Sequence, residues 1–322
     1  MSDYAIGIDI GGTKIAAGLV DSKGQVLVRG QLPTPGFDPA AVLQTVCTLV
    51  AQLGAVGNDT VVGVGAAGWM DLSGSTVAFS PHLSWREEPL RANLEKALGR
   101  RVLLSNDADA AGWAEYRFGA ARGEENMVCV NLGTGIGGAL VLEGRLQRGR
   151  FGMAGEFGHQ VMVPGGHRCA CGNRGCWEQY ASGRALEREG RALLTVHGPV
   201  GNKLREACGS DPHALSGEMV CALASEGDAA CSELVIEVGQ WLGLGLANLA
   251  AVLDPGVMII GGGLGASSSL LLETAEQTFI ASLSGRGYRP FARVVGSELG
   301  VDAGLVGAAE LARGHLLINS LR

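Results

Sequence analysis

Residues 4–20 read YAIGIDIGGTKIAAGLV, and residues 127–142 read MVCVNLGTGIGGALVL. Each stretch is an apolar run, then a turn of glycine and threonine, then a second apolar run. Apolar runs joined by a short glycine turn predict two antiparallel strands. Because the pattern returns roughly 120 residues later, the sequence predicts an internal duplication.

Strands and helices alternate between and after these two copies. The apolar spacing predicts further strands at 60–65, 101–104 and 257–260, and helices at 39–53, 88–98, 106–118, 232–253 and 305–316. A duplicated mixture of this kind predicts α/β domains with mixed sheets around a central cleft. We expect a small domain at 1–106, with the last helix within 305–322 packing back on it. A large domain is expected at 107–304, carrying a cysteine-rich loop.

Composition narrows the class of protein. The chain has 322 residues, of which 47% are hydrophobic and 18% charged, so it can bury a large core. Its net charge of −7 is not that of a nucleic-acid-binding or membrane-surface protein, and we expect neither partner. Because the first predicted strand begins at Tyr4, we expect no leader, and 242–253, the stretch closest to a membrane span, is far too short for one. We therefore expect a cytoplasmic protein whose eight cysteines are reduced or bind metal.

The first glycine turn, Asp9–Lys14, has the groups of a phosphate site. Its glycines let successive N–H groups point at an anion, Lys14 adds a positive charge, and Asp9 can hold Mg²⁺ through water. Alone, such a turn is more often an ordinary hairpin. A second turn at 132–138 in the equivalent place predicts that the two bind one polyphosphate. Neither turn opens a helix, which excludes the P-loop and dinucleotide patterns.

A metal site is predicted by the spacing His159-x9-Cys169-x-Cys171-x4-Cys176. Four such ligands within a short loop suit a closed, tetrahedral structural Zn²⁺ site. His167 is an alternative fourth ligand. The plainer interpretation is that the cysteines are reduced thiols in a glycine-rich loop. The clustering of three cysteines makes that interpretation the weaker one.

Three acidic segments are candidates for substrate chemistry. Asn106-Asp107 follows a predicted strand, and a carboxylate there can accept a proton during phosphoryl transfer. From the residues alone, a helix N-cap is the better interpretation. Glu156 and Glu178 flank the predicted metal loop, which would hold both rigidly; each alone is more typical of a solvated surface charge.

Together these motifs resemble the ROK family of sugar kinases and related repressors, which is built on the actin-like ATPase (ribonuclease H-like) fold. The resemblance covers nearly the whole chain and rests on Asp9–Lys14, Asn106-Asp107, 132–138, Gly155–His159, the cysteine cluster, Glu178 and Gly261–Gly263. Within the family the chain is most similar to the actinobacterial glucokinases, through 81–90, 115–120 and 177–183.

The resemblance implies transfer of the γ-phosphate of ATP to the 6-hydroxyl of glucose, with Asp107 as the catalytic base. It implies that the sugar is bound by Gly68, Asn106, Asp107, Glu156, His159 and Glu178. It implies that ATP with Mg²⁺ is bound by Asp9, Gly11, Gly12, Thr13, Lys14, Gly133, Thr134, Gly135, Gly261, Gly262 and Gly263. It also implies structural Zn²⁺ on His159, Cys169, Cys171 and Cys176, and a homodimer or homotetramer.

Two other functions share these motifs in part. A kinase of N-acetylglucosamine or N-acetylmannosamine has every one of them and differs in the wall of the sugar pocket. A sugar-sensing regulator carries an N-terminal helix-turn-helix, and here the phosphate-binding strand begins at Tyr4. Many members of the family carry Asn at the position of His82, and Asn is also usual at the position of Asp109.

Overall fold

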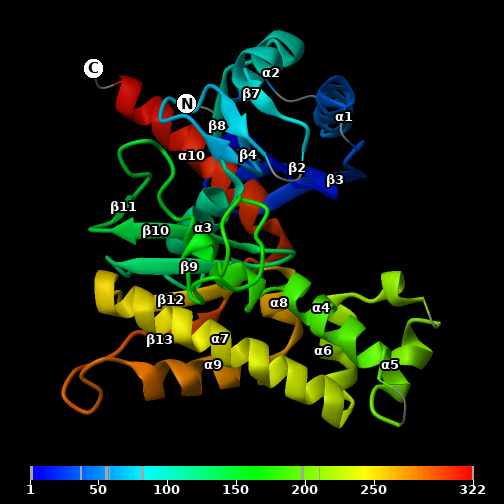
Figure 1. The fold of residues 1–322 in the computed structure, drawn as a ribbon. Coiled ribbons are helices and arrows are strands. Elements are labelled where there is room, and N and C mark those ends of the chain that lie inside the picture. The colour runs from blue at the N-terminus through cyan, green and yellow to red at the C-terminus, as the bar shows by residue number, and fades with distance from the viewer. Residues whose placement is uncertain are drawn as a thin grey trace. The chain divides into compact units, whose positions relative to one another are not determined.

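The computed structural model describes residues 3–36, 38–54, 57, 59–80, 83–196, 199–209 and 211–320 (Figure 1). The strands are β1 (Tyr4–Ile10), β2 (Lys14–Asp21), β3 (Val26–Pro33), β4 (Val62–Ala66), β5 (Trp69–Met70), β6 (Val77–Phe79), β7 (Arg86–Glu88), β8 (Val102–Asn106), β9 (Met127–Leu132), β10 (Ile136–Leu142), β11 (Arg145–Leu146), β12 (Val257–Gly261) and β13 (Arg293–Gly296).

The helices are α1 (Pro39–Gln52), α2 (Leu90–Leu98), α3 (Asp107–Phe118), α4 (Gly183–Leu194), α5 (Asn202–Ala207), α6 (Gly217–Ser225), α7 (Ala229–Leu253), α8 (Gly262–Ser267), α9 (Ser269–Ser282) and α10 (Ala303–Ser320). Short 3-10 helices lie at Phe157–His159, Trp177–Gln179, Pro212–Ala214 and Gly300–Asp302.

Two five-stranded sheets share one strand order. The first is β3-β2-β1-β4-β8 and the second is β11-β10-β9-β12-β13. In the first, β1 is antiparallel to β2 and parallel to β4, which is parallel to β8. In the second, β12 is parallel to both β9 and β13. The repeated order confirms the duplicated, mixed-sheet α/β fold predicted from the two glycine-turn copies.

Contacts divide the chain into two compact units. Unit 1 comprises 1–123, 139–155 and 301–322, and unit 2 comprises 124–138 and 156–300. Both α3 and α10 therefore belong to unit 1. The domain boundary predicted from the sequence, at 106/107, differs from the boundaries of these two units and stays a prediction.

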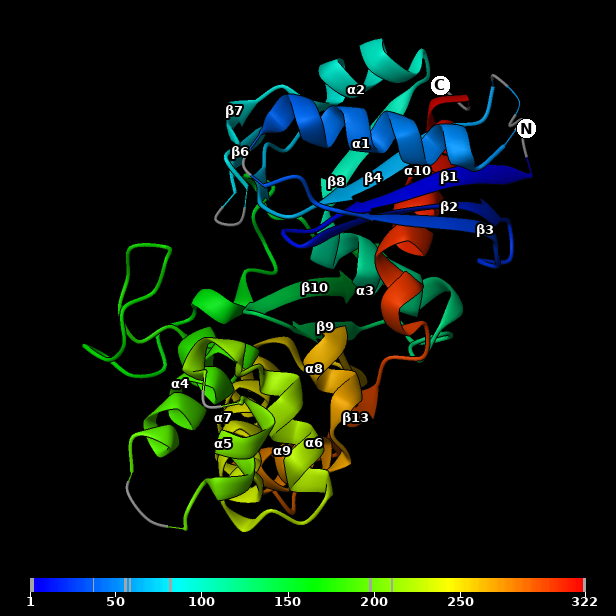
Figure 2. The same ribbon diagram turned by 90° about the vertical axis from the view of Figure 1, so that its right-hand side faces the viewer.

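In unit 1, helices cover both faces of the first sheet. Figure 2 shows α1 and α2 on one face and α3 and α10 on the other. Because side chains alternate along a strand, Ile6, Ile8 and Ile10 of β1 all face the α1 side, where they are fully buried in the core with Val46 and Leu49. Asp38 caps α1 by accepting a hydrogen bond from Ala40 N at 2.9 Å, as the Asp-Pro start of this helix predicts.

The opposite face of the sheet is lined by glycines where α10 crosses it. A Cβ placed on Gly7 would lie 1.9 Å from the carbonyl oxygen of Leu305, and one on Gly63 would lie 1.8 Å from that of Ala308. Any larger residue at either position would push α10 off the sheet. These glycines therefore fix how closely α10 packs.

Unit 2 is built around the long helix α7. By length and composition α7 is apolar enough to cross a membrane, but 56% of its apolar window is buried in the protein. It packs on α9, α6 and α4, which is the pattern of a core helix.

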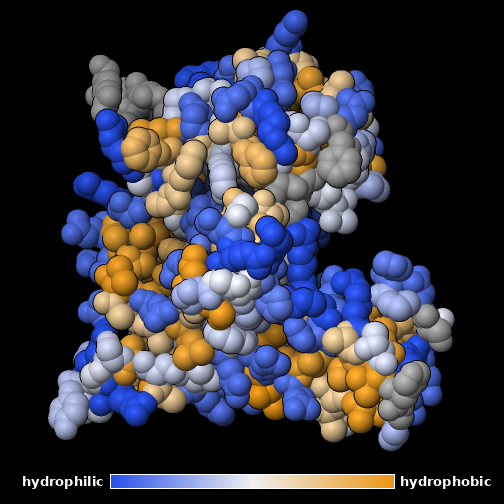
Figure 3. Space-filling model, in the orientation of Figure 1, coloured by the Kyte–Doolittle hydropathy of each residue, from blue (hydrophilic) through white to orange (hydrophobic). Residues whose placement is uncertain are grey.

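On the face shown in Figure 3, hydrophobic residues (orange) lie in groups among hydrophilic ones (blue).

Candidate functional site

In unit 1, three predicted site segments leave the sheet at one edge. The parallel strands β1, β4 and β8 are in register, with Ile10 opposite Ala66 and Ala66 opposite Asn106. The Gly11–Lys14 turn follows β1 and Gly68 follows β4, while β8 ends on Asn106 itself. The carboxyl edge of a parallel sheet is where α/β proteins bind ligands. The fold therefore brings these segments together.

Asn106 is the N-cap of α3, as the plainer interpretation of the sequence predicted. Its Oδ1 accepts hydrogen bonds from Ala108 N at 2.8 Å and Asp109 N at 3.0 Å. Its Nδ2 donates to the carbonyl oxygen of Gly68 at 3.1 Å. The capping bonds leave the second Nδ2 hydrogen for another acceptor, so capping and sugar binding are compatible roles.

Gly68 is a glycine for a steric reason. Its φ is +136°, and a Cβ there would lie 2.6 Å from the carbonyl oxygen of Phe79 on β6. Side chains rarely adopt this backbone conformation. The residue thus lets two backbone segments meet beside Asn106.

Asp9 lies at the same edge, on the face of β1 that carries Gly7. A Cβ on Gly304, in the first turn of α10, would lie 2.7 Å from Asp9 Oδ2. Burial, and then the neighbouring carboxylate of Asp107, raise the pKa of Asp9 to about 7, against a smaller lowering by Lys14. Asp9 thus belongs to a site with excess negative charge, which a bound cation would relieve.

The Gly11–Lys14 turn is held by its own backbone and by a residue that the sequence did not indicate. Gly11 N donates to Lys14 O at 3.0 Å. Thr34, which follows β3, donates from its hydroxyl to Gly11 O at 2.7 Å and from its N–H to Thr13 O at 2.9 Å. Thr13 and Lys14 remain exposed. The turn is therefore ordered while its cationic side chain stays accessible.

In unit 2, the predicted metal ligands form one cluster. One ligand atom from each of His159, Cys169, Cys171 and Cys176 lies within 4.8 Å of all the others. Cys171 Sγ and Cys176 Sγ are 3.6 Å apart, as are Cys169 Sγ and His159 Nδ1. A tetrahedral Zn²⁺ with Zn–S bonds of about 2.3 Å sets sulfurs about 3.8 Å apart, and sulfur and imidazole nitrogen about 3.5 Å apart. The spacing fits zinc.

The alternative ligand, His167, is not in this cluster. Its ring packs on that of Tyr180, with centroids 5.2 Å apart. The Tyr180 hydroxyl also accepts a hydrogen bond from His167 N at 3.0 Å. The structure thus gives His167 a place in the scaffold of the loop.

Carboxylates surround the cluster. Glu178 Oε1 lies 3.0 Å from Cys169 Sγ and 3.9 Å from His159 Nδ1, and Glu156 Oε2 lies 3.8 Å from His159 Nε2. Burial, and then Glu178, raise the pKa of the Cys169 thiol, and burial also raises that of Cys176. Thiolates in such a place require a cation, which again fits a bound metal.

Trp177 holds Glu178 in position. Its side chain is fully buried, and its Nε1 donates to the carbonyl oxygen of Trp241 on α7 at 2.8 Å. A Cβ on Gly245 of α7 would lie 2.0 Å from the indole ring, so the ring lies directly on the helix backbone. The 3-10 helix Trp177–Gln179 is thereby fixed to α7.

The second glycine turn meets Glu178. A Cβ on Gly135 would lie 2.4 Å from Glu178 Oε2. On its other side the turn adjoins the start of α8, since a Cβ on Gly262 would lie 2.2 Å from Leu132 O. Gly261 is opposite Asn131 in the pairing of β12 with β9. Unit 2 therefore brings together the metal loop, Glu178, the second turn and Gly261–Gly263.

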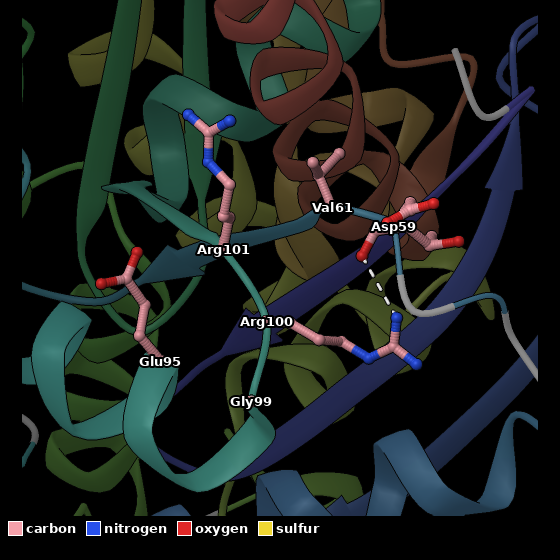
Figure 4. A pocket seen from close by; sticks show the side chains of 7 residues that line it. Asp59, Val61, Glu95, Gly99, Arg100 and Arg101 are labelled. Carbon is pink, nitrogen blue, oxygen red and sulfur yellow. Dashed lines mark hydrogen bonds between the residues drawn. The ribbon is translucent and has the colours of Figure 1, made fainter.

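A separate cavity of about 590 Å³ in unit 1 lies away from these residues (Figure 4). It is lined by Asp59, Thr60, Val61, Glu95, Gly99, Arg100 and Arg101. Arg100 donates across it to Thr60 O at 3.4 Å. The lining residues precede β4 and β8, so the cavity opens at the amino ends of strands whose carboxyl ends carry the candidate residues. His82, whose role the sequence left open, lies outside the described residues.

Comparison with known proteins places the site in context. Residues 5–315 match the ROK family. The chain is 43% identical over 309 residues to a glucokinase of Streptomyces coelicolor, covering 96% of this chain and 97% of that one. It is 31% identical over 319 residues to an N-acetylmannosamine kinase of Escherichia coli, covering 97% and 99%.

A crystal structure of a ROK family glucokinase from Streptomyces griseus, in complex with glucose and AMPPNP, superposes with a TM-score of 0.90 at 42% identity. The match covers 97% of this chain and 99% of that one. The fold is therefore the actin-like ATPase fold that the sequence motifs predicted.

Proposed function

The chain belongs to the ROK family, and from this membership we propose that it is an ATP-dependent glucokinase. The observation that carries the proposal is the near-full-length match to Streptomyces glucokinases, one of which was crystallised with glucose and AMPPNP. The reaction is transfer of the γ-phosphate of ATP to the 6-hydroxyl of glucose.

Asp107 acts as the base. It accepts the proton of the 6-hydroxyl as that oxygen attacks the γ-phosphorus, and the bond from the γ-phosphorus to the β–γ bridging oxygen breaks, releasing ADP. What supports this role is its place at the first residue of α3, at the carboxyl edge of three parallel strands. Asn106 and the backbone of Gly68, joined by their hydrogen bond, bind sugar hydroxyls.

The two glycine turns bind the phosphates. In this proposal Gly11, Gly12, Thr13, Lys14, Gly133, Thr134 and Gly135 bind the phosphates of ATP, and Gly261–Gly263 bind its nucleoside. Mg²⁺, when bound, neutralises charge on the phosphates that the chain itself does not neutralise. Asp9 would hold this ion, a role that is supported by its burial and by the neighbouring carboxylate of Asp107.

The metal cluster is structural in this proposal. His159, Cys169, Cys171 and Cys176 supply four ligands, which leaves no open position for a reacting group. Zn²⁺ bound there fixes the loop. Glu156, His159 and Glu178 would then be presented to the sugar hydroxyls; His159 Nδ1 lies 3.6 Å from Cys169 Sγ, and its Nε2 lies 3.8 Å from Glu156 Oε2.

Location and assembly complete the proposal. We place the protein in the cytoplasm as a homodimer or homotetramer. All eight cysteines are free thiols in the structure, which agrees with a reducing compartment. No nucleic-acid or membrane partner is proposed.

A second candidate function is supported by the similarity to N-acetylmannosamine kinase. A kinetic panel separates the two: glucose, mannose, N-acetylglucosamine and N-acetylmannosamine at saturating ATP. We expect kcat/KM for glucose to exceed that for either N-acetyl sugar by at least about 100-fold, because an acetamido group would hold the site open and misplace the 6-hydroxyl. A higher kcat/KM for an N-acetyl sugar would replace glucokinase with hexosamine kinase. Phosphate transfer to none of the four would defeat both.

A further inference from the structure

A buried carboxylate two residues from the proposed base takes part in an ion pair. Asp109, in the first turn of α3, is 2% exposed. Arg148, which follows β11, brings its Nε to 3.7 Å from Asp109 Oδ2. A carboxylate removed from water needs a compensating charge. Arg148 supplies one.

Arg148 also binds a turn of the three-stranded sheet. Its Nη1 donates to Leu72 O at 3.3 Å, and its Nη2 donates to Asp71 O at 3.3 Å. This turn joins β5 to β6, directly after Gly68 in the chain. The planar guanidinium can hold a carboxylate and two carbonyl oxygens at fixed angles, which a lysine ammonium cannot do as well. One side chain thus ties the first turn of α3 to the segment that follows Gly68.

The loop that carries Arg148 is itself closed. Ala154 N donates to Arg148 O at 3.1 Å. A Cβ on Gly152 would lie 3.0 Å from the Cα of Leu72, so the loop packs on the same β5–β6 turn. Gly155 and the proposed sugar ligand Glu156 follow directly in the chain.

We propose that Arg148 is a positioning residue for the transfer step. It neutralises Asp109, two residues from Asp107 in the first turn of α3, and it holds this turn against the β5–β6 turn. The inference rests on the proposed kinase function, in which Asp107 is the base.

Other charged groups among the described residues also lie on the elements around this turn. Asp9 faces Asp107 from β1, and Lys14 faces Asp9 from β2. On α10, Glu310 pairs with Arg313, and with Arg117 near the far end of α3. Removing Arg148 therefore leaves the proposed base among carboxylates, with Lys14 as the cation that acts on Asp9.

The test uses Arg148→Met, Asp109→Asn and the double variant in the full chain. We expect Arg148→Met to lower kcat for glucose at least about tenfold with KM changed less than about threefold. The acid limb of its kcat–pH profile should move to higher pH, because an uncompensated carboxylate makes ionisation of the base harder. Asp109→Asn should move the limb to lower pH. The double variant should return it to the wild-type position, which a purely structural role for the pair would not produce.

Two further variants sharpen the result. Arg148→Lys keeps the positive charge but lacks the planar guanidinium, so the acid limb of the kcat–pH profile should stay in place while kcat falls. Arg150→Met removes an exposed arginine from the same loop and should leave kcat and its pH profile unchanged. Circular dichroism melts identify any variant that fails to fold, and the double variant then carries the test.

The outcomes separate the two proposals. A wild-type chain that phosphorylates no sugar defeats the proposed function. An active wild type whose folded Arg148→Met variant keeps kcat and acid limb overturns the positioning role alone. The positioning role is also overturned if the acid limb of the double variant lies as far from that of the wild type as the acid limb of Arg148→Met does.

Discussion

The candidate residues of the two units are held in place by different means. In unit 1, Asp9 and Asn106 stand on strands, and Asp107 begins a helix, so sheet register and a helix cap position them. In unit 2, Glu156, His159 and Glu178 stand in irregular backbone with two short 3-10 helices. The first arrangement is determined by backbone hydrogen bonds. The second depends on side chains meeting at one point.

This difference has an electrostatic side. The cysteine cluster needs thiolates, yet burial raises the pKa of the Cys169 thiol and Glu178 raises it further. Without a cation the loop therefore holds groups that oppose one another. At the edge of the unit 1 sheet, backbone hydrogen bonds and a helix cap hold the residues in position. We expect unit 2 to lose sugar binding on loss of metal, and unit 1 to lose chemistry on loss of one carboxylate.

The largest effect should come from unit 1. Asp107→Asn removes the base and keeps size and polarity, so kcat should fall at least about 10³-fold while glucose binding changes little. Coupled-assay kinetics and a glucose titration of intrinsic fluorescence measure the two. Thermal melts serve as the control, since Asn106 still caps α3. A folded variant that keeps more than about a tenth of wild-type kcat would remove Asp107 from the base role.

Metal loss should act through unit 2. Cys171→Ser should lower zinc content from about one per chain, lower Tm by at least about 5 °C and raise KM for glucose about tenfold. Elemental analysis, melts and kinetics give the three values. Cys47→Ser, a half-buried cysteine of α1 in unit 1, is the matched control and should keep its zinc. Full glucose affinity in protein shown to be metal-free would break the link between metal and sugar.

A smaller effect is expected where the second turn meets Glu178. Gly135→Ala places a Cβ against Glu178 Oε2, so Glu178 must shift, and KM for glucose should rise by up to about tenfold. Gly133→Ala is the matched change, because no atom lies within 4 Å of the added Cβ. It should spare KM for glucose and act on KM for ATP. Equal effects of both variants on glucose would show that Gly135 acts through the turn as a whole.

The smallest effect concerns stability. The pKa of Asp9 is raised to about 7 from 3.8, so the folded protein binds this proton more tightly than the unfolded chain does. Stability should therefore fall as pH rises from about 4 to about 7. Asp9→Asn removes this loss, so its Tm should exceed that of the wild type at pH 8 and approach it near pH 4.

Thermal melts from pH 4 to 8 without nucleotide check this, with Asp3→Asn, an exposed carboxyl just before the same strand, as control. Adding Mg²⁺ with ATP should stabilise the wild type more than Asp9→Asn, so that the wild type has the higher Tm of the two at pH 8. A Tm difference that does not change with pH would show that Asp9 is ionised throughout.

Much of the fold could be predicted from local sequence. Tyr4–Ile10 and Met127–Leu132 were located to the residue because apolar runs and glycine turns bound them. The sheet β5-β6-β7 was missed because strands of two or three residues show no periodicity. The start of α4 carried a usable signal, since Ser182 caps it by accepting from Ala185 N at 3.4 Å.

The site follows the same rule. The metal cluster could be predicted because its four ligands lie within eighteen residues. Contacts between distant segments could not. Thr34 meets Gly11 only because β3 and β1 flank β2. Arg148 pairs with Asp109 although it lies 39 positions later in the chain, and no local sequence pattern indicates that contact. The sequence marks which residue types can do chemistry, and tertiary pairing decides which of them have neighbours.

The close packing of α10 on Gly7 and Gly63 also bears on biosynthesis. Unit 1 contains both the first strand and the last helix of the chain, whereas unit 2 is complete by residue 300. During translation unit 2 can fold first, and β1 must wait until α10 has been synthesised before the two can pack. Asp107 therefore stands in an incomplete unit 1 until α10 has been synthesised. A nascent chain stalled before residue 301 would carry its metal loop without a working phosphotransferase.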